Sequence, residues 1–320
     1  MEFILWNREE FDRVYNCTGI NVDDIPIEQR RYPIAAIICI ILGCIYYSQK
    51  SLLYTFNLSF NNGYWHSLGP TFAHGFFSLT GVVYCSSPKL TYFVGTAYLF
   101  LWAAECSADL ILGINRCIEM AFPNISKKLF HNNRIYIWII FCTLYGIYWL
   151  LFRHPYIFNG ITFQVLFDPL IGYKPFRIEF FEEDLKEFTI HNTILAIGSP
   201  VIYFTFSLCF FFKARELINV VSKEEKMVFI QVFIVSMFNT SAGIVYAYNM
   251  NHADHGILPV MIAHFSWLHI HGFPPVIYLT LNKTVRTDTK ILFRKLFTSF
   301  KTNRNRVSTL AGYTNNNQIE

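Results

Sequence analysis

Uncharged stretches, each long enough to cross a lipid bilayer as a helix, alternate along the chain with short charged connections. A membrane helix needs about 20 mostly apolar residues. By this criterion the pattern predicts an all-α membrane protein with a seven-transmembrane helix bundle over residues 33–282. The expected spans are residues 33–52, 64–84, 90–114, 135–152, 189–212, 228–250 and 258–281. We assign residues 1–32 to an N-terminal segment and residues 283–320 to a tail.

The second expected span is the least apolar of the seven. It contains Trp65, His66, Gly69, Pro70 and His74, so its hydropathy is marginal. A chain with six spans and one re-entrant segment is therefore the structural alternative. Six spans would place both termini on the same side of the membrane, and the distribution of charge tests that arrangement.

Basic residues are concentrated in the segments that a seven-span topology places inside. With the N-terminus outside, the inner segments contain 17 of the 26 Lys and Arg residues but only six of the 22 Asp and Glu residues. This bias follows the positive-inside rule and favours seven spans. Only 15% of residues are charged, against about 25% in soluble domains, and 53% are hydrophobic. The net charge of +4 and the lack of a basic block interleaved with aromatic residues argue against a nucleic-acid partner.

The connections between the spans contain several candidate features. Residues 153–187 form the longest outer loop, and we expect either a lid over a pocket or a solvated surface. Residues 283–297 have the pattern of an amphipathic helix lying on membrane lipid at the inner surface. Asn16 begins an Asn-Cys-Thr glycosylation sequon on the outer side.

Cys17 and Cys85 are the only cysteines that this topology places outside. Because an outer compartment permits disulfides, we expect the two to bond and to hold the N-terminal segment over the bundle. Two free thiols are the alternative.

Glu105 and Asp109 are the only acids inside a span, and their spacing places them on one helix face. Acids within a membrane face the bundle interior or water and are candidates for function. They would either form the polar floor of a ligand pocket or make structural hydrogen bonds to a neighbouring helix. No HExxH, paired His-His or GxSxG motif accompanies them, so we expect no metal, no cofactor and no enzymatic activity.

Two patterns stand out at the inner ends of the spans. The third span ends in Asn115, Arg116 and Cys117, which places an arginine at the inner mouth of the bundle. The seventh span ends in PPVIYLTLN, where Pro274 and Pro275 interrupt the backbone hydrogen bonds of a helix one turn before Tyr278. A proline kink of this kind gives neighbouring helices a place to repack.

Together these two patterns resemble the D-R-Y and N-P-x-x-Y signatures of G-protein-coupled receptors. More closely, the chain resembles the nematode serpentine chemoreceptors of class T. The residues that carry the resemblance are YNC at 15–17, RRYP at 30–33, GVVYCSSP at 81–88, LGINRC at 112–117 and HGFPPVIYLTLNKTVR at 271–286. They occur in order over nearly the whole membrane unit.

The resemblance implies a rhodopsin-like fold and detection of a small environmental molecule through a heterotrimeric G protein. It also implies a multi-pass protein of the plasma membrane, at a sensory cilium. Arg116 would then reach the G protein, and Tyr278 would take part in the switch. Asn115 stands where the D-R-Y motif has an acid, so no ion pair forms within that motif. Pro274 stands where the N-P-x-x-Y motif has asparagine.

A chemosensory receptor is the leading functional hypothesis. From depth and chemistry, its ligand-binding residues are expected to be Tyr98, Trp102, Glu105, Asp109, His264 and Trp267. A transporter or ligand-gated channel is the second class, although the chain has no internal repeat and acids in only one span. A seven-span metal-dependent hydrolase is the third. The sequence does not indicate the oligomeric state.

Overall fold

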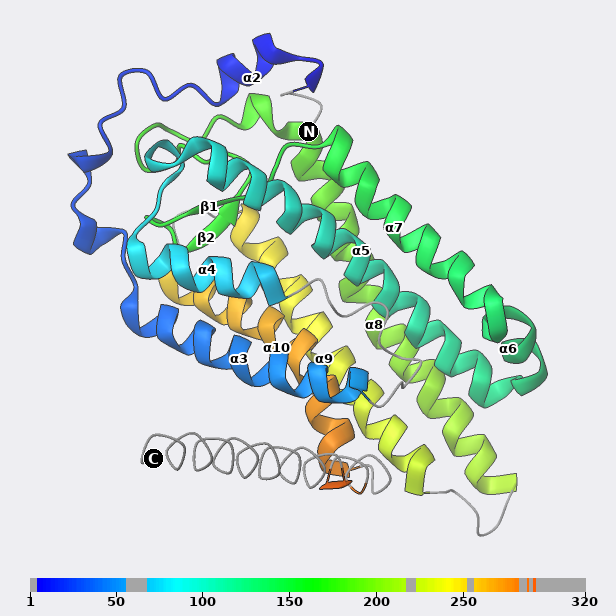
Figure 1. Ribbon diagram of the computed structural model, residues 1–320. Coiled ribbons are helices and arrows are strands. Elements are labelled where there is room, and N and C mark those ends of the chain that lie inside the picture. Colours follow the sequence, from blue (N-terminus) through cyan, green and yellow to red (C-terminus); the bar gives the residue numbers. More distant parts are fainter. Residues whose placement is uncertain are drawn as a thin grey trace, which may run out of the picture.

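The computed structural model describes residues 5–55, 68–216, 223–251 and 256–281, together with residues 287, 290 and 291 of the tail. Within these residues the chain forms a bundle of long helices with a small β-hairpin at one end (Figure 1). We call this end, which also carries the N-terminal segment, the lid end. The opposite end carries the short helix α6 (Pro123–Phe130), and we call it the α6 end.

A long helix lies at each of the seven stretches that the sequence singles out. The helices are α3 (Pro33–Thr55), α4 (Leu68–Thr80), α5 (Pro88–Ala121), α7 (Ile135–Phe152), α8 (Glu182–Glu216), α9 (Lys223–Asn251) and α10 (Ile257–Leu281). Helices α5 and α8 run well past their expected ends, to 34 and 35 residues. Helix α4 has only 13 residues. It is thus shorter than the expected span 64–84, whose first four residues lie outside the described part.

Proline residues set several of the helix boundaries. Pro33, Pro88 and Pro123 each occupy the first position of a helix, where a missing N–H costs nothing and the fixed φ angle suits the helix. Pro123 also explains the end of α5, because the residue before a proline is driven out of the helical conformation. Phe122 is accordingly non-helical, with φ −140° and ψ 70°, and the chain turns there into α6.

The helices pack as a ring that a contact between α4 and α5 closes. Helix α3 packs against α4 and α10, α10 against α9, α9 against α8, α8 against α5, and α5 against α7 (Figure 1). Helix α2 (Arg8–Val14) and the strands β1 (Ile157–Asn159) and β2 (Gln164–Leu166) lie across the lid end. The strands pair antiparallel, with Phe158 opposite Val165. Short 3-10 turns occupy Val22–Asp24, Ile27–Gln29, Tyr84–Ser86, Asn132–Arg134 and Ile178–Phe180.

Large apolar side chains cover the outside of the bundle. Ile34 is 78% exposed on α3, Ile137 62% on α7 and Phe204 64% on α8. Apolar surface on this scale suits contact with lipid rather than water. Within the described residues, three helices are both long and apolar enough to cross a membrane by themselves, at Pro88–Ala121, Asn132–Phe152 and Glu182–Lys213. Shorter apolar helices lie at Pro33–Tyr47, Val232–Tyr246 and Ile257–His269.

The structure changes one expectation from the sequence, and a second expectation concerns residues outside the described part. The all-helical prediction is incomplete, because the loop at 153–187 contains the β-hairpin. The amphipathic helix expected at 283–297 lies almost entirely outside the described residues. The seven helices agree with the fold class, whereas a complete crossing by each of them stays a prediction.

Close packing of α7 on α5 depends on Gly146. A Cβ atom at this position would lie 2.8 Å from the backbone oxygen of Phe100 and 3.0 Å from Cβ of Ala104. We expect Gly146→Ala to force the two helices apart and to lower stability by about 1–3 kcal/mol, measured by thermal unfolding in detergent. Gly198→Ala is the matched control, because its Cβ would meet only Leu110 at an ordinary 3.4 Å. Equal midpoints for the two variants would contradict the packing argument.

Candidate functional site

A folded loop closes the lid end of the bundle. Residues 153–181, which we call the lid, contain the β-hairpin and lie over the helix ends (Figure 1). Most of the apolar side chains of the lid are buried, namely Tyr156, Ile157, Phe158, Phe163, Val165, Leu166, Phe167, Leu170 and Phe181. Of the two alternatives that the sequence left open, the structure has the lid rather than the solvated surface.

The N-terminal segment is tied to this lid and to the bundle. A disulfide joins Cys17 to Cys85, which precedes α5, with the two Cα atoms 5.7 Å apart. The hydroxyl of Tyr32 donates to the backbone oxygen of Ile161 at 3.0 Å, and that of Tyr173 donates to Val22 at 2.7 Å. The segment and the lid therefore form one connected layer. The sequence pointed to the two cysteines but not to the hydrogen bonds.

A buried ion pair and a buried hydrogen bond hold the lid in place. The carboxylate of Asp168, which is fully buried, pairs with the guanidinium of Arg177, and Nη1 of Arg177 also donates to the backbone oxygen of Val14 at 2.9 Å. Nδ1 of His154 lies 2.8 Å from Oδ2 of Asp184 in the first turn of α8. These contacts link the lid to the N-terminal segment on one side and to α8 on the other.

The buried residue Tyr15 joins the N-terminal segment to α5 and to the residues before it. Its ring lies 5.7 Å from that of Tyr84 and 5.4 Å from that of Tyr92. Burial raises the pKa of the Tyr15 phenol well above its ordinary value, with nearby Tyr92 and Asp184 adding to the effect. The hydroxyl of Tyr15 therefore stays protonated and neutral at physiological pH.

Below the lid, aromatic and histidine rings from α4, α5 and α10 meet in the bundle. The rings of His74 and His264 stack with centroids 3.6 Å apart, and Trp267 stacks on Tyr98 at 5.5 Å. The lid contributes Phe158, whose ring lies 4.7 Å from that of His74. All five of these side chains are nearly inaccessible to solvent.

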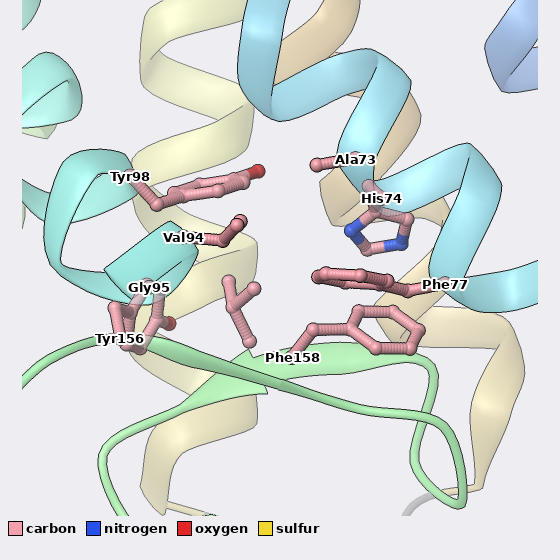
Figure 2. A pocket seen from close by; sticks show the side chains of 9 residues that line it. Ala73, His74, Phe77, Val94, Gly95, Tyr98, Tyr156 and Phe158 are labelled. Atoms are coloured by element: carbon pink, nitrogen blue, oxygen red, sulfur yellow. The ribbon is translucent and has the colours of Figure 1, made fainter. Parts of the chain in front are cut away.

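A small pocket lies between these rings and the lid. Its lining residues are Ala73, His74, Phe77, Val94, Gly95, Tyr98, Tyr156, Phe158 and Val165. Figure 2 shows the α5 residues Val94 and Tyr98 on one side and the α4 residues His74 and Phe77 on the other. The cavity has a volume of about 10 Å³, which is room for roughly one water molecule. A larger molecule would enter only if the lid or the neighbouring helices moved.

The structure brings together some of the expected ligand-binding residues and separates others. Tyr98, His264 and Trp267 lie in one cluster, at or beside the pocket. Trp102 turns instead towards α7 and α8, where it packs on Trp149, Phe188 and His191.

The two acids of α5 lie further towards the α6 end, and neither lines the pocket. Glu105 is 2% exposed and Asp109 is half-buried. Among the described residues, no group of three or more His, Cys, Asp and Glu side chains is arranged to hold a metal.

At the α6 end, the residues of the Asn-Arg-Cys motif have three different partners. Arg116 pairs with Glu119 one turn later, with 2.7 Å between Nη1 and Oε2. The hydroxyl of Ser126 on α6 donates to Oδ1 of Asn115 at 3.1 Å. The thiol of Cys117 donates to the backbone oxygen of Ile202 on α8 at 3.4 Å. Arg116 thus pairs with Glu119, because Asn115 has no charge to offer it.

Of the remaining expected residues, three have side chains outside the described part of the structure, and one is exposed. The helix α10 contains Pro274, Pro275 and Tyr278, whose side chains are outside the described part of the structure. Asn16 is exposed, and its side-chain oxygen accepts a hydrogen bond from the backbone N–H of Thr18 at 2.7 Å.

Eight of the nine pocket residues, among them His74 and the lid residues Tyr156 and Phe158, were not predicted from the sequence. A histidine in the least apolar span was the one available signal, since a polar ring there needs a reason to be buried. The two lid residues carried no signal, because aromatic residues occur throughout this chain.

These observations define a helical membrane bundle with a lid-covered pocket at one end. The chain from residue 68 to residue 304 matches the family described as serpentine type 7TM GPCR chemoreceptor Srt. Because the match covers more than half of the 320 residues, the chain belongs to this family of multi-pass membrane chemoreceptors. The resemblance inferred from the sequence motifs is therefore confirmed, and the family is one of receptors rather than enzymes.

Among curated proteins, the chain is similar to serpentine receptor class T-55 of Caenorhabditis elegans. The two are 25% identical over 228 residues, which is 69% of this chain. The chain spans 59% of the length of that relative.

Proposed function

We propose that this protein is a chemosensory G-protein-coupled receptor of the plasma membrane, placed at a sensory cilium, that detects a small environmental molecule. The N-terminus and the lid face the outside, and the α6 end faces a heterotrimeric G protein in the cytoplasm. The observation that carries the proposal is the lid-covered pocket within a member of a chemoreceptor family. Binding shifts the equilibrium towards an active state only if the molecule prefers that state.

Arg116 is the residue we assign to G-protein coupling. It lies at the α6 end of α5, where it pairs with Glu119 and only 18% of its side chain is exposed. Breaking the pair with Glu119 would release the guanidinium towards a partner below the bundle. Tyr278, Pro274 and Pro275 on α10 are proposed to take part in the same switch.

The proposal is tested by expressing the full chain in cells and measuring G-protein activation against a panel of small volatile and water-soluble compounds. We expect at least one compound to activate the receptor, and Arg116→Ala to reduce the response roughly tenfold or more, as for loss of a charged hydrogen bond. Arg8→Ala removes one positive charge from the exposed face of α2 and serves as the matched control with an unchanged response.

Surface labelling of an N-terminal tag checks expression and orientation in the same cells. Ligand-evoked current or uptake that survives Arg116→Ala would contradict the G-protein mechanism. It would favour a channel or transporter instead.

A further inference from the structure

The short helix α6 turns both apolar and basic side chains outwards at the end of the bundle. Phe122, just before the helix, is 60% exposed, Ile125 is 47% exposed and Leu129 is 40% exposed. Because a helix repeats every 3.6 residues, side chains spaced by three and four positions share one face. We call these three residues the α6 stripe. The same helix also exposes Lys127 and Lys128.

Contacts to α5 and α7 hold the α6 stripe facing outwards. Ser126 is buried, and its hydrogen bond to Asn115 fixes which side of α6 turns towards α5. At the end of the helix, Nε1 of Trp138 donates to the backbone oxygen of Leu129 at 3.1 Å, and the Trp138 ring stacks on that of Phe130 at 5.2 Å. The exposure of the stripe is therefore part of the fold.

The length of α7 places α6 at the level of the lipid headgroups. With 18 residues at about 1.5 Å each, α7 is about 27 Å long, close to the hydrocarbon thickness of about 30 Å. Helix α6 joins the start of α7 through the turn Asn132–Arg134 and packs on α5 (Figure 1). Trp138 lies one turn into α7, at the depth where tryptophan is enriched in membrane proteins. Apolar surface continues from there along α7, where Ile137 is 62% exposed.

The charge of this region complements an anionic membrane surface. Residues 120–167 contain no Asp or Glu, whereas α6 and the turn after it contain Lys127, Lys128 and Arg134, all three exposed. Water alone would suit these charges but not the α6 stripe, and the hydrocarbon core would suit the stripe but not the charges. The boundary between the two suits both, and anionic headgroups there attract each Lys or Arg with a gain in affinity of about fivefold.

We propose that α6 lies flat on the membrane surface, with the α6 stripe among the upper acyl chains and with Lys127, Lys128 and Arg134 on anionic phospholipid headgroups. Because α6 is bonded to the Asn-Arg-Cys motif, lipid bound there steadies the end of α5. The proposal goes beyond the receptor function and needs no G protein. Together with the proposed orientation, it assigns these lipids to the cytoplasmic leaflet, which carries the anionic lipid of a cell membrane.

The experiment replaces Leu129 of the full chain by the photoreactive amino acid benzoylphenylalanine. The protein is reconstituted in nanodiscs in which phosphatidylcholine is the major lipid and phosphatidylserine the minor one. Mass spectrometry identifies the lipid that the probe captures on illumination. The same probe at Ile137, on the exposed side of α7, reports lipid capture without a basic cluster on its own helix face.

We expect the probe at position 129 to capture lipid, with phosphatidylserine enriched about tenfold over its share of the bilayer, as two or more basic contacts supply. Lys127→Gln combined with Lys128→Gln should bring the captured lipid close to the bilayer composition, and high salt should do the same. Lys89→Gln is the matched control. It removes an exposed lysine at the lid end of α5 and should leave the enrichment unchanged.

Absence of lipid capture at position 129 while the probe at position 137 captures lipid would overturn the proposal. Capture without preference for phosphatidylserine, or a preference that survives Lys127→Gln combined with Lys128→Gln, would overturn it as well. In cell membranes, an adduct with a protein in place of lipid would assign the α6 stripe to that protein and contradict the proposal. Formation of the Cys17–Cys85 disulfide reports correct folding of each variant.

Discussion

Replacing Asp168 by alanine is expected to loosen the lid and its contact with the N-terminal segment, which Arg177 makes at Val14. Asp168 is fully buried and accepts hydrogen bonds from the backbone N–H groups of Leu170 and Arg177 and from the guanidinium of Arg177. Without the carboxylate, a largely buried guanidinium has no counter-charge, and removing one partner of a buried pair costs about 3–5 kcal/mol. At about 1.4 kcal/mol for each factor of ten, the open population of the lid should rise roughly a hundredfold or more.

The rate of protease cleavage within residues 153–181 measures this opening. Asp168→Asn keeps the shape and one hydrogen-bonding oxygen, so we expect an intermediate cleavage rate. Glu182→Gln is the control, because that carboxylate pairs with Lys186 in full contact with solvent and its loss should leave cleavage unchanged. A lid in Asp168→Ala that resists protease as the unmodified chain does would show that the pair has no role in closure.

Loss of the disulfide is the second large expected effect. The bond between Cys17 and Cys85 closes a long loop, with a sequence separation of 68 residues, and a native disulfide typically contributes about 2–4 kcal/mol. We expect Cys85→Ser to lower the thermal unfolding midpoint and to expose the N-terminal segment to protease. The physical reason is that the open chain gains conformations that the bond excludes.

A double substitution separates the bond from the two side chains. If the bond acts as one unit, Cys17→Ser combined with Cys85→Ser should be no less stable than either single variant. Cys44→Ser, which replaces an exposed free cysteine, should leave the midpoint unchanged. Unreduced peptides in which mass spectrometry finds both thiols free would rule out the bond.

The positions of the long helices could be predicted from the sequence because charge is excluded from lipid. Helix α7 (Ile135–Phe152) has the same bounds as its uncharged stretch. The extra length of α5 and α8 could not be read in this way. Beyond the bilayer a helix no longer needs to be apolar, so Lys89 at one end of α5 and Glu119 at the other are compatible with continued helix.

The pocket was harder to predict than the helices. The lid strands have only three residues each, and their side chains are buried at every position but Gln164, so no alternating pattern reveals them. The stacking of His74 on His264 depends on how α4 and α10 are rotated about their axes, which no local pattern specifies. The pair between Arg116 and Glu119 is different. Residues three apart on a helix are neighbours, so this contact could have been predicted from the spacing alone, although it was not.

The buried lid also has a consequence for timing. Because the buried lid residues Tyr156, Phe158 and Val165 line the pocket, a molecule larger than water would enter or leave it only when the lid or the neighbouring helices move. Its rate of arrival then levels off at the opening rate of the protein, however concentrated the molecule becomes. Departure depends on the same motion, so occupancy outlasts a brief exposure and the protein averages its chemical surroundings over the lifetime of the closed lid.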